Sequence, residues 1–181
     1  FDKKKGGKRW NYYRNISESH SVPLIDGKRQ DETGKASVIG FDSNDAEARV
    51  SIDLTDAYRD RAKQVTRDVA LTNLRKAVVV RDRYELTSHH DIVWAMTTDA
   101  DIAILPDGAA ALSLDGKKLI ARVIEPKGVA FVMESAERPG PEKPNKGVRR
   151  LLLRVNDATG NTNISVMLAP VWDDGAVESI E

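Results

Sequence analysis

AAALSLDGKKLIARVIEP, residues 109–126, is the stretch from which the fold is most directly read. Two largely apolar runs flank the dipeptide Asp115-Gly116. Asp-Gly readily adopts the two left-handed conformations of a tight turn between antiparallel strands. The stretch therefore predicts a β-hairpin, and its residues follow the period of two that strands show rather than the helical period of 3.6.

The same strand-like sequence pattern extends over most of the chain on both sides of this hairpin. Further strands are expected at residues 37–41, 48–52, 64–72, 76–86, 91–98, 101–106, 129–135, 148–155 and 162–171. The exception is DLTDAYRDRA, residues 53–62, which predicts one helical turn with Asp53 or Thr55 as its cap. About ten short strands with almost no helix predict an all-β fold, an antiparallel two-layer β-sandwich with one short helix.

Composition excludes several classes of function. The 181 residues contain 28 Lys and Arg and 28 Asp and Glu, so the formal net charge is zero and no overall field attracts nucleic acid or an anionic membrane. There is no cysteine, which excludes disulfides, a thiol nucleophile and cysteine-based zinc sites. No run approaches the length of a membrane span. The chain begins Phe1-Asp2 without a methionine or a signal peptide, so we expect a processed or excised piece of a protein.

Charge and proline content divide the chain into three parts. Residues 1–13 form a basic and aromatic leading segment that contains KKKGGKR, which is either a flexible stretch or a contact for an acidic ligand. Residues 14–171 carry the predicted sandwich, interrupted by the proline-rich surface loop at 137–147. Residues 172–181 form a tail, expected to be frayed or to lie at a sheet edge.

Three clusters of chemistry-bearing residues have ordinary explanations. His89 and His90 are adjacent, so on a strand their side chains would point to opposite faces and would not converge on a metal. DSND at 42–45 lacks the glycine and distal glutamate of an EF-hand and is expected to be a turn. Asp99 and Asp101 could face the same side, but they lie beside loop residues. No phosphate-binding loop, dinucleotide fingerprint, zinc-protease motif or nucleophile elbow occurs.

The third histidine, His20, lies in SESHSVPLIDGKRQ, residues 17–30, where nothing in local propensity requires an imidazole. A lone histidine is most often a structural residue with satisfied hydrogen bonds. From the residues alone, the sequence predicts a soluble β-sandwich and little more.

RNISESHSVPLIDGKRQ, residues 14–30, resembles the heparinase II/III-like polysaccharide lyases, in the stretch that opens their C-terminal β domain. The matching residues are Arg14, His20, Val22, Pro23, Asp26, Gly27 and Gln30. Ser21 stands where that family has asparagine, and the Arg-to-His spacing is longer by a residue or so. The similarity continues in SIDLTDAY (51–58) and in the strands VTRDVAL and VVVRDRYEL, with a basic residue in the first and an aspartate in the second.

The resemblance implies a two-part enzyme, of which this chain is the β-sandwich domain and an N-terminal α/α toroid the missing partner. The implied reaction is β-elimination on an acidic polysaccharide that contains uronic acid, such as heparan sulfate or alginate, in the periplasm or outside the cell. The resemblance also implies a Zn or Ca site with His20 as one ligand and the others upstream. We expect the chain alone to hold no metal, to contain no catalytic residue and to be inactive.

Tyr12, Tyr13 and Arg14 are the candidates for contact with the polysaccharide at the entrance to the cleft, although purely structural roles remain open for them. Two other interpretations remain. A stand-alone carbohydrate-binding module would present exposed aromatic side chains, for which Trp10 and Tyr12 are the candidates. A purely structural β-sandwich would bind no glycan.

Overall fold

The computed structural model describes Lys4 and residues 6–179, so the first part of the basic run (1–3 and 5) and the end of the tail (180–181) lie outside the described residues. The strands are β1 Leu24–Ile25, β2 Ser37–Ser43, β3 Ala48–Asp53, β4 Ala62–Thr72, β5 Ala77–Leu86, β6 His90–Thr98, β7 Asp101–Ile104, β8 Ala110–Leu114, β9 Lys117–Glu125, β10 Val132–Ser135, β11 Arg149–Ala158 and β12 Asn161–Pro170. Four single 3₁₀ turns complete the secondary structure: η1 Lys8–Asn11, η2 Tyr13–Asn15, η3 Ser17–Ser19 and η4 Thr55–Ala57.

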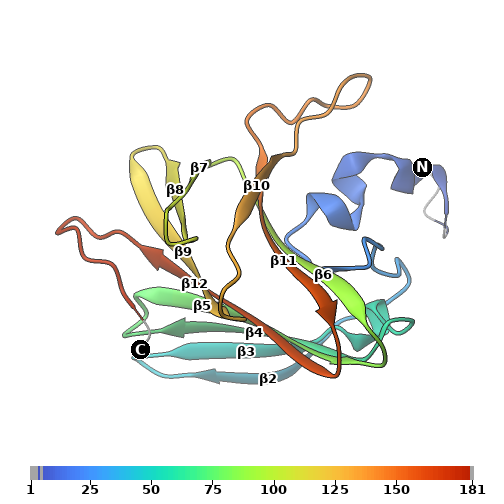
Figure 1. Cartoon of the computed structure of the whole chain (residues 1–181), viewed down its shortest axis with the longest axis horizontal. Coiled ribbons are helices and arrows are strands. Elements are labelled where there is room, and N and C mark those ends of the chain that lie inside the picture. The colour runs from blue at the N-terminus through green and yellow to red at the C-terminus, as the bar shows by residue number, and fades with distance from the viewer. Residues whose placement is uncertain (1–3, 5, 180–181) are drawn as a thin grey trace.

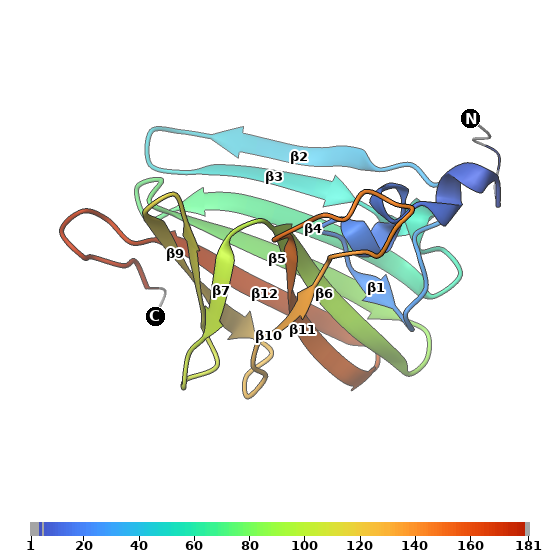
Figure 2. The same cartoon turned by 90° about the horizontal axis from the view of Figure 1, so that it is seen from above.

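Two antiparallel sheets stack face to face (Figure 1). The smaller sheet has the order β1-β6-β11-β10, and the larger one has the order β2-β3-β4-β5-β12-β9-β8-β7. The predicted two-layer β-sandwich is therefore confirmed. The larger sheet extends well beyond the smaller one, and β2 and β3 lie outside its edge (Figure 2).

The hairpin at residues 109–126 forms as its turn chemistry predicts. Asp115 and Gly116 have φ angles of 48° and 75°, and β8 pairs with β9 on either side of them. The expected helix at 53–62 is reduced to η4, with the Asp53 carboxylate accepting a hydrogen bond from the Thr55 backbone N–H at 2.9 Å. Residues 58–61 form a further turn, and β4 begins at Ala62, which leaves no room for a longer helix.

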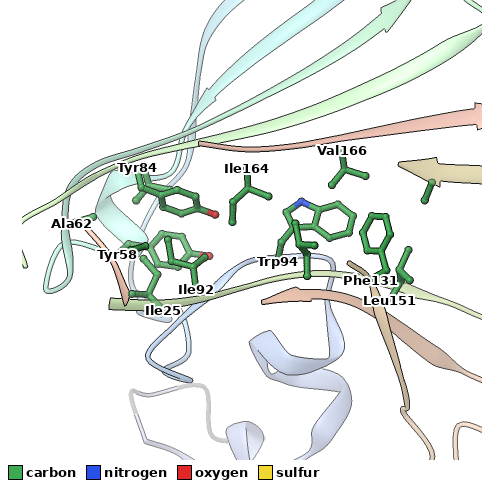
Figure 3. Packing of buried hydrophobic residues seen from close by; sticks show 14 of the residues in the cluster. Ile25, Tyr58, Ala62, Tyr84, Ile92, Trp94, Phe131, Leu151, Ile164 and Val166 are labelled. Carbon is green, nitrogen blue, oxygen red and sulfur yellow. The ribbon is translucent and has the colours of Figure 1, made fainter. Parts of the chain in front are cut away.

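The core lies between the two sheets. Figure 3 shows Tyr58 and Tyr84 packed near Ile25 at one end, and Trp94 near Phe131 towards the other. A second, smaller cluster joins the N-terminal turns to the loop between β10 and β11, and contains Tyr13, Ile16 and Ala136, with Trp10 and Val148 against them. The N-terminal segment thus packs against the β10–β11 loop, and His20 follows its last 3₁₀ turn, shortly before β1.

Candidate functional site

His20 lies at the end of η3, in extended backbone, and its main-chain N–H donates to the Ser17 carbonyl at 3.1 Å. The side chain is exposed. Its imidazole makes no hydrogen bond or ion pair with any other residue in the described part of the chain. This histidine is therefore presented at the surface.

The next residue, Ser21, is held by both sheets. Its carbonyl accepts a hydrogen bond from Arg67 Nη1 of β4 at 2.7 Å. Its hydroxyl accepts one from the backbone N–H of Thr97 at 3.0 Å, on β6 of the smaller sheet. Because both partners belong to regular strands, the backbone directly after His20 has little freedom to move.

Arg67 is itself held by a buried carboxylate. Its Nε and Nη2 lie 2.6 and 2.7 Å from the two oxygens of Asp82 on β5, which is completely buried. Burial alone would lower the pKa of Arg67, but the hydrogen bonds and charge of Asp82 raise this pKa above its usual range. This bidentate pair leaves Nη1 aimed at the Ser21 carbonyl.

Pro23, Asp26 and the following turn are fixed in the same way. The Tyr58 hydroxyl, which is fully buried, donates to the Pro23 carbonyl at 2.7 Å. Asp26 and Gly27 form a tight turn with φ angles of 53° and 65°. One oxygen of Asp26 accepts from the Asp91 backbone N–H at 3.0 Å, and the other lies 2.8 Å from His90 Nδ1. The His90 hydrogen bond lowers the pKa of the Asp26 carboxyl.

The end of the segment 17–30 is hydrogen-bonded to its beginning. The Gln30 backbone N–H donates to the Ser17 hydroxyl at 3.0 Å. Arg61, 4% exposed, donates to the carbonyls of Lys28 and Arg29 at 3.2 and 3.0 Å. Residues 17–30 therefore form a loop held by hydrogen bonds from both sheets and from the turn at residues 58–61.

A cavity of about 480 Å³ opens beside this loop. Its lining includes Trp10, Asn15, His20, Arg29, Asp31 and Glu32. The lining offers aromatic, amide, cationic and anionic groups together, which suits hydrogen bonding to a polar ligand. Over Lys4 and residues 6–179, however, no three histidine, aspartate or glutamate side chains gather closely enough to hold a metal ion. His20 alone does not make a metal site, and further ligands would have to come from outside the described residues.

The three expected sugar contacts have different environments. Tyr12 is 52% exposed, whereas Tyr13 is 5% exposed. The Tyr13 hydroxyl donates to the Glu18 carbonyl at 3.2 Å, and the Arg138 guanidinium stacks 3.8 Å from its ring centre. Arg14 is exposed, and its Nε donates to the buried Asn145 side chain. Only Tyr12 and Arg14 are placed to reach a ligand without rearrangement, and contact with a polysaccharide stays a prediction for all three.

The remaining clusters have local partners. His89 Nδ1 lies 2.7 Å from Asp157, so the adjacent histidines bond to different carboxylates. Asp101 pairs with Arg149 at 2.7 Å. The 42–45 stretch runs from the end of β2 into a turn, in which the Asn44 side chain accepts the backbone N–H of Glu47 at 2.9 Å.

The residues that sequence reasoning did not single out are Arg67, Asp82 and Arg61. A signal for the first two was present, because a basic residue and an aspartate occur in neighbouring strands. In register they face each other directly. Sequence alone could not show that the pair points inward or that it reaches Ser21, 46 residues earlier.

Solved structures with the same fold exist. The heparan sulfate lyase HepC from Pedobacter heparinus superposes with a TM-score of 0.69 and 14% identity, covering 84% of this chain and 24% of its own. A heparinase III structure gives a TM-score of 0.69 and 13% identity, covering 91% of this chain and 26% of its own. The chain has the fold of a heparinase-type β domain. A further heparinase III structure matches this domain with a TM-score of 0.70 at 14% identity.

This heparinase-type β domain spans about a quarter of the length of the structures that it matches. Its sequence matches no protein-family model and no curated protein. Among the residues described, no helix is long and apolar enough to cross a membrane.

Proposed function

We propose that this chain is the β domain of a polysaccharide lyase that cleaves acidic, uronate-containing polysaccharide by β-elimination, in the periplasm or outside the cell. The fold shared with HepC and heparinase III supports the proposal, together with the small share of those chains that the domain accounts for. The rigid presentation of an unpartnered His20 beside a polar cavity is the observation that carries it.

In the proposed reaction a base removes the proton on C5 of the uronate, and the C4–O bond to the neighbouring sugar breaks. The electron pair of the C–H bond forms a C4–C5 double bond, and the leaving oxygen takes up a proton. The acidity of C5 depends on neutralising the uronate carboxylate. We assign the base and the acid to the remaining part of the lyase polypeptide, and assign this domain to one wall of the cleft.

The role of His20 is to supply one imidazole ligand to a Zn or Ca ion whose other ligands lie in the remaining part of the polypeptide. When bound, such an ion would tie the two parts together. Zn accepts imidazole nitrogen readily, whereas Ca prefers oxygen, so the donor type favours Zn. Fixing Ser21 from both sheets places the backbone next to His20 before any ion arrives, which reduces the backbone entropy lost on binding.

The rival function is a stand-alone carbohydrate-binding module. Such a module needs exposed aromatic side chains on one face. Trp10 is only partly exposed and packs into the small N-terminal cluster. Tyr12, Phe41 and Trp172 are exposed, but they belong to three separate elements, the N-terminal turns, β2 and the residues after β12. The N-terminal segment and the residues after β12 lie at opposite ends of the molecule (Figure 1). The described residues therefore offer no aromatic platform, which favours the lyase domain.

The test is a lyase assay of the complete polypeptide on heparan sulfate, alginate and a neutral glucan as control. The unsaturated uronate produced by elimination absorbs in the ultraviolet, whereas hydrolysis produces no such chromophore. We expect absorbance to increase with an acidic substrate and not with the glucan, and no increase with the 181-residue chain alone. A complete polypeptide that acts on none of a broad set of uronate polysaccharides would contradict the proposal.

A further inference from the structure

The inner face of the larger sheet is only partly covered by the smaller sheet. One row of apolar side chains runs in register across five neighbouring strands, β2, β3, β4, β5 and β12: Phe41, Val50, Val69, Val80 and Val166. Val166 is completely buried in the core. Val50, Val69 and Val80 are half-buried, and Phe41 at the open end is 74% exposed. The row therefore leaves the core between β12 and β5 and continues into solvent.

A neighbouring row on the same face links this surface to His20. Val38 of β2 pairs with Ile52 of β3, which pairs with Arg67 of β4. Val38 is 66% exposed, while Arg67 donates to the Ser21 carbonyl. The cavity beside His20 includes residues 35, 36 and 54, which precede β2 and follow β3. The partly covered apolar face of the larger sheet and the His20 loop thus lie next to each other.

The outer edge of this face is the strand β2, whose pairing with β3 has one register shift, between Val38 and Gly40. All seven residues of β2, SVIGFDS, are exposed, and the strand contains neither lysine nor proline. Sheet edges in stable monomers are usually short or carry such residues, because an open apolar edge pairs with other chains. Exposed apolar surface of this kind, beside a polar rim, is typical of an interaction site.

We propose that the uncovered half of the larger sheet, defined by Val38, Phe41, Val50, Ile52 and Val69, is the docking surface for the remaining part of the lyase polypeptide. The inference rests on the proposed function. The chain accounts for about a quarter of each heparinase-type structure that it matches, so a body several times its size is to be placed against it. A body that completes a metal site at His20 must lie over that loop, and the apolar face begins where the loop ends.

The experiment is hydroxyl-radical footprinting with mass spectrometry, on the complete polypeptide and on the 181-residue chain. Leu74, 72% exposed in the turn between β4 and β5, is the matched reference for Phe41. We expect the two side chains to react at similar rates, after correction for residue type, in the 181-residue chain. In the complete polypeptide, the rate at Phe41 should fall roughly tenfold relative to Leu74, because a packed interface would exclude water from its ring.

A variant tests the specificity of the protection. In the complete polypeptide, Phe41→Asp should restore labelling of Val50 and Val69, whereas Leu74→Asp should leave them protected. Both positions are exposed in the domain, so neither substitution is expected to unfold it.

Three outcomes would overturn the docking surface: equal labelling of Phe41 in both proteins, equal effects of the two variants, or protection of Phe41 in the 181-residue chain that increases with its concentration. The last result would assign the face to a second copy of this chain. Protection is measured without substrate. A protected Phe41 in a polypeptide without lyase activity would therefore contradict the proposed function and not the docking surface.

Discussion

Replacing Arg67 by methionine tests whether the buried ion pair holds the His20 loop. The substitution keeps most of the apolar stem but removes the bidentate contact to Asp82 and the hydrogen bond to Ser21. Asp82 is completely buried, so its charge is left without an opposite charge beside it and keeps only the Tyr84 hydroxyl at 3.4 Å. Removing one partner of a buried pair lowers the free energy of unfolding by about 3–5 kcal/mol. This is a large part of the ~5–15 kcal/mol that stabilises a typical domain.

The assay is urea unfolding of the 181-residue chain, followed by circular dichroism. With a slope of about 2.5 kcal/mol per molar urea, the Arg67→Met midpoint should fall by roughly 1.5 M. Amide exchange should also rise at residues 20–24, next to the lost Ser21 contact.

The control uses an ion pair on the same two strands. Lys63 lies 3.2 Å from Glu85, and both side chains are exposed. Lys63→Met should change the free energy of unfolding by less than about 1 kcal/mol. The double variant Arg67→Met with Asp82→Leu should recover much of the loss, because it buries no unpaired charge. An Arg67→Met midpoint indistinguishable from that of Lys63→Met would show that the buried Arg67–Asp82 pair does not stabilise the domain.

Two further predictions concern the loops around the site. The hydrogen bond from His90 lowers the pKa of Asp26 in the folded state, so its stabilising effect is present above the unfolded value of about 3.9 and is lost as pH falls through the folded value. The difference in unfolding free energy between the natural chain and Asp26→Asn should therefore shrink as pH falls from about 5 towards 3; a difference that does not change over this range would exclude this linkage. Gly34→Ala would place a Cβ 2.7 Å from the Ala57 Cα and should lower the free energy of unfolding by about 1–3 kcal/mol in a thermal or urea titration. At Gly140 a Cβ has nothing within 4 Å, so Gly140→Ala is the control, and an equally small effect at both positions would contradict the close approach.

Much of the fold follows from local patterns. Asp115-Gly116 predicted its hairpin because turn chemistry is decided within four residues. The strands that became β4, β5 and β6 were long enough to show their period of two. The two-residue β1 was missed because it is too short to show any period.

Strand order was beyond the sequence because it depends on contacts between distant residues. β12 inserts between β5 and β9, and β6 pairs with β11 in the other sheet. No local pattern specifies such pairings. The same limit applies to the incomplete cover over Phe41, since an exposed and a buried strand face can share one apolar pattern.

The site was predictable in part. His20 was singled out by resemblance, and the structure places it on the surface beside a cavity. What makes the loop rigid came only from the structure, because Arg67, Tyr58 and Arg61 reach it from 32 to 46 residues away in sequence.

The proposed role of His20 is to be one ligand of a metal ion shared with the remaining part of the lyase polypeptide. The most direct measurement is the metal content of the complete polypeptide and its His20→Ala variant, by elemental mass spectrometry after dialysis. His89→Ala is the matched control, because His89 is also an exposed histidine with no part in the proposed site. We predict one tightly held ion in the natural polypeptide and in the His89 variant, and a strongly reduced content after His20→Ala. An ion retained equally in all three proteins would show that His20 is not one of its ligands.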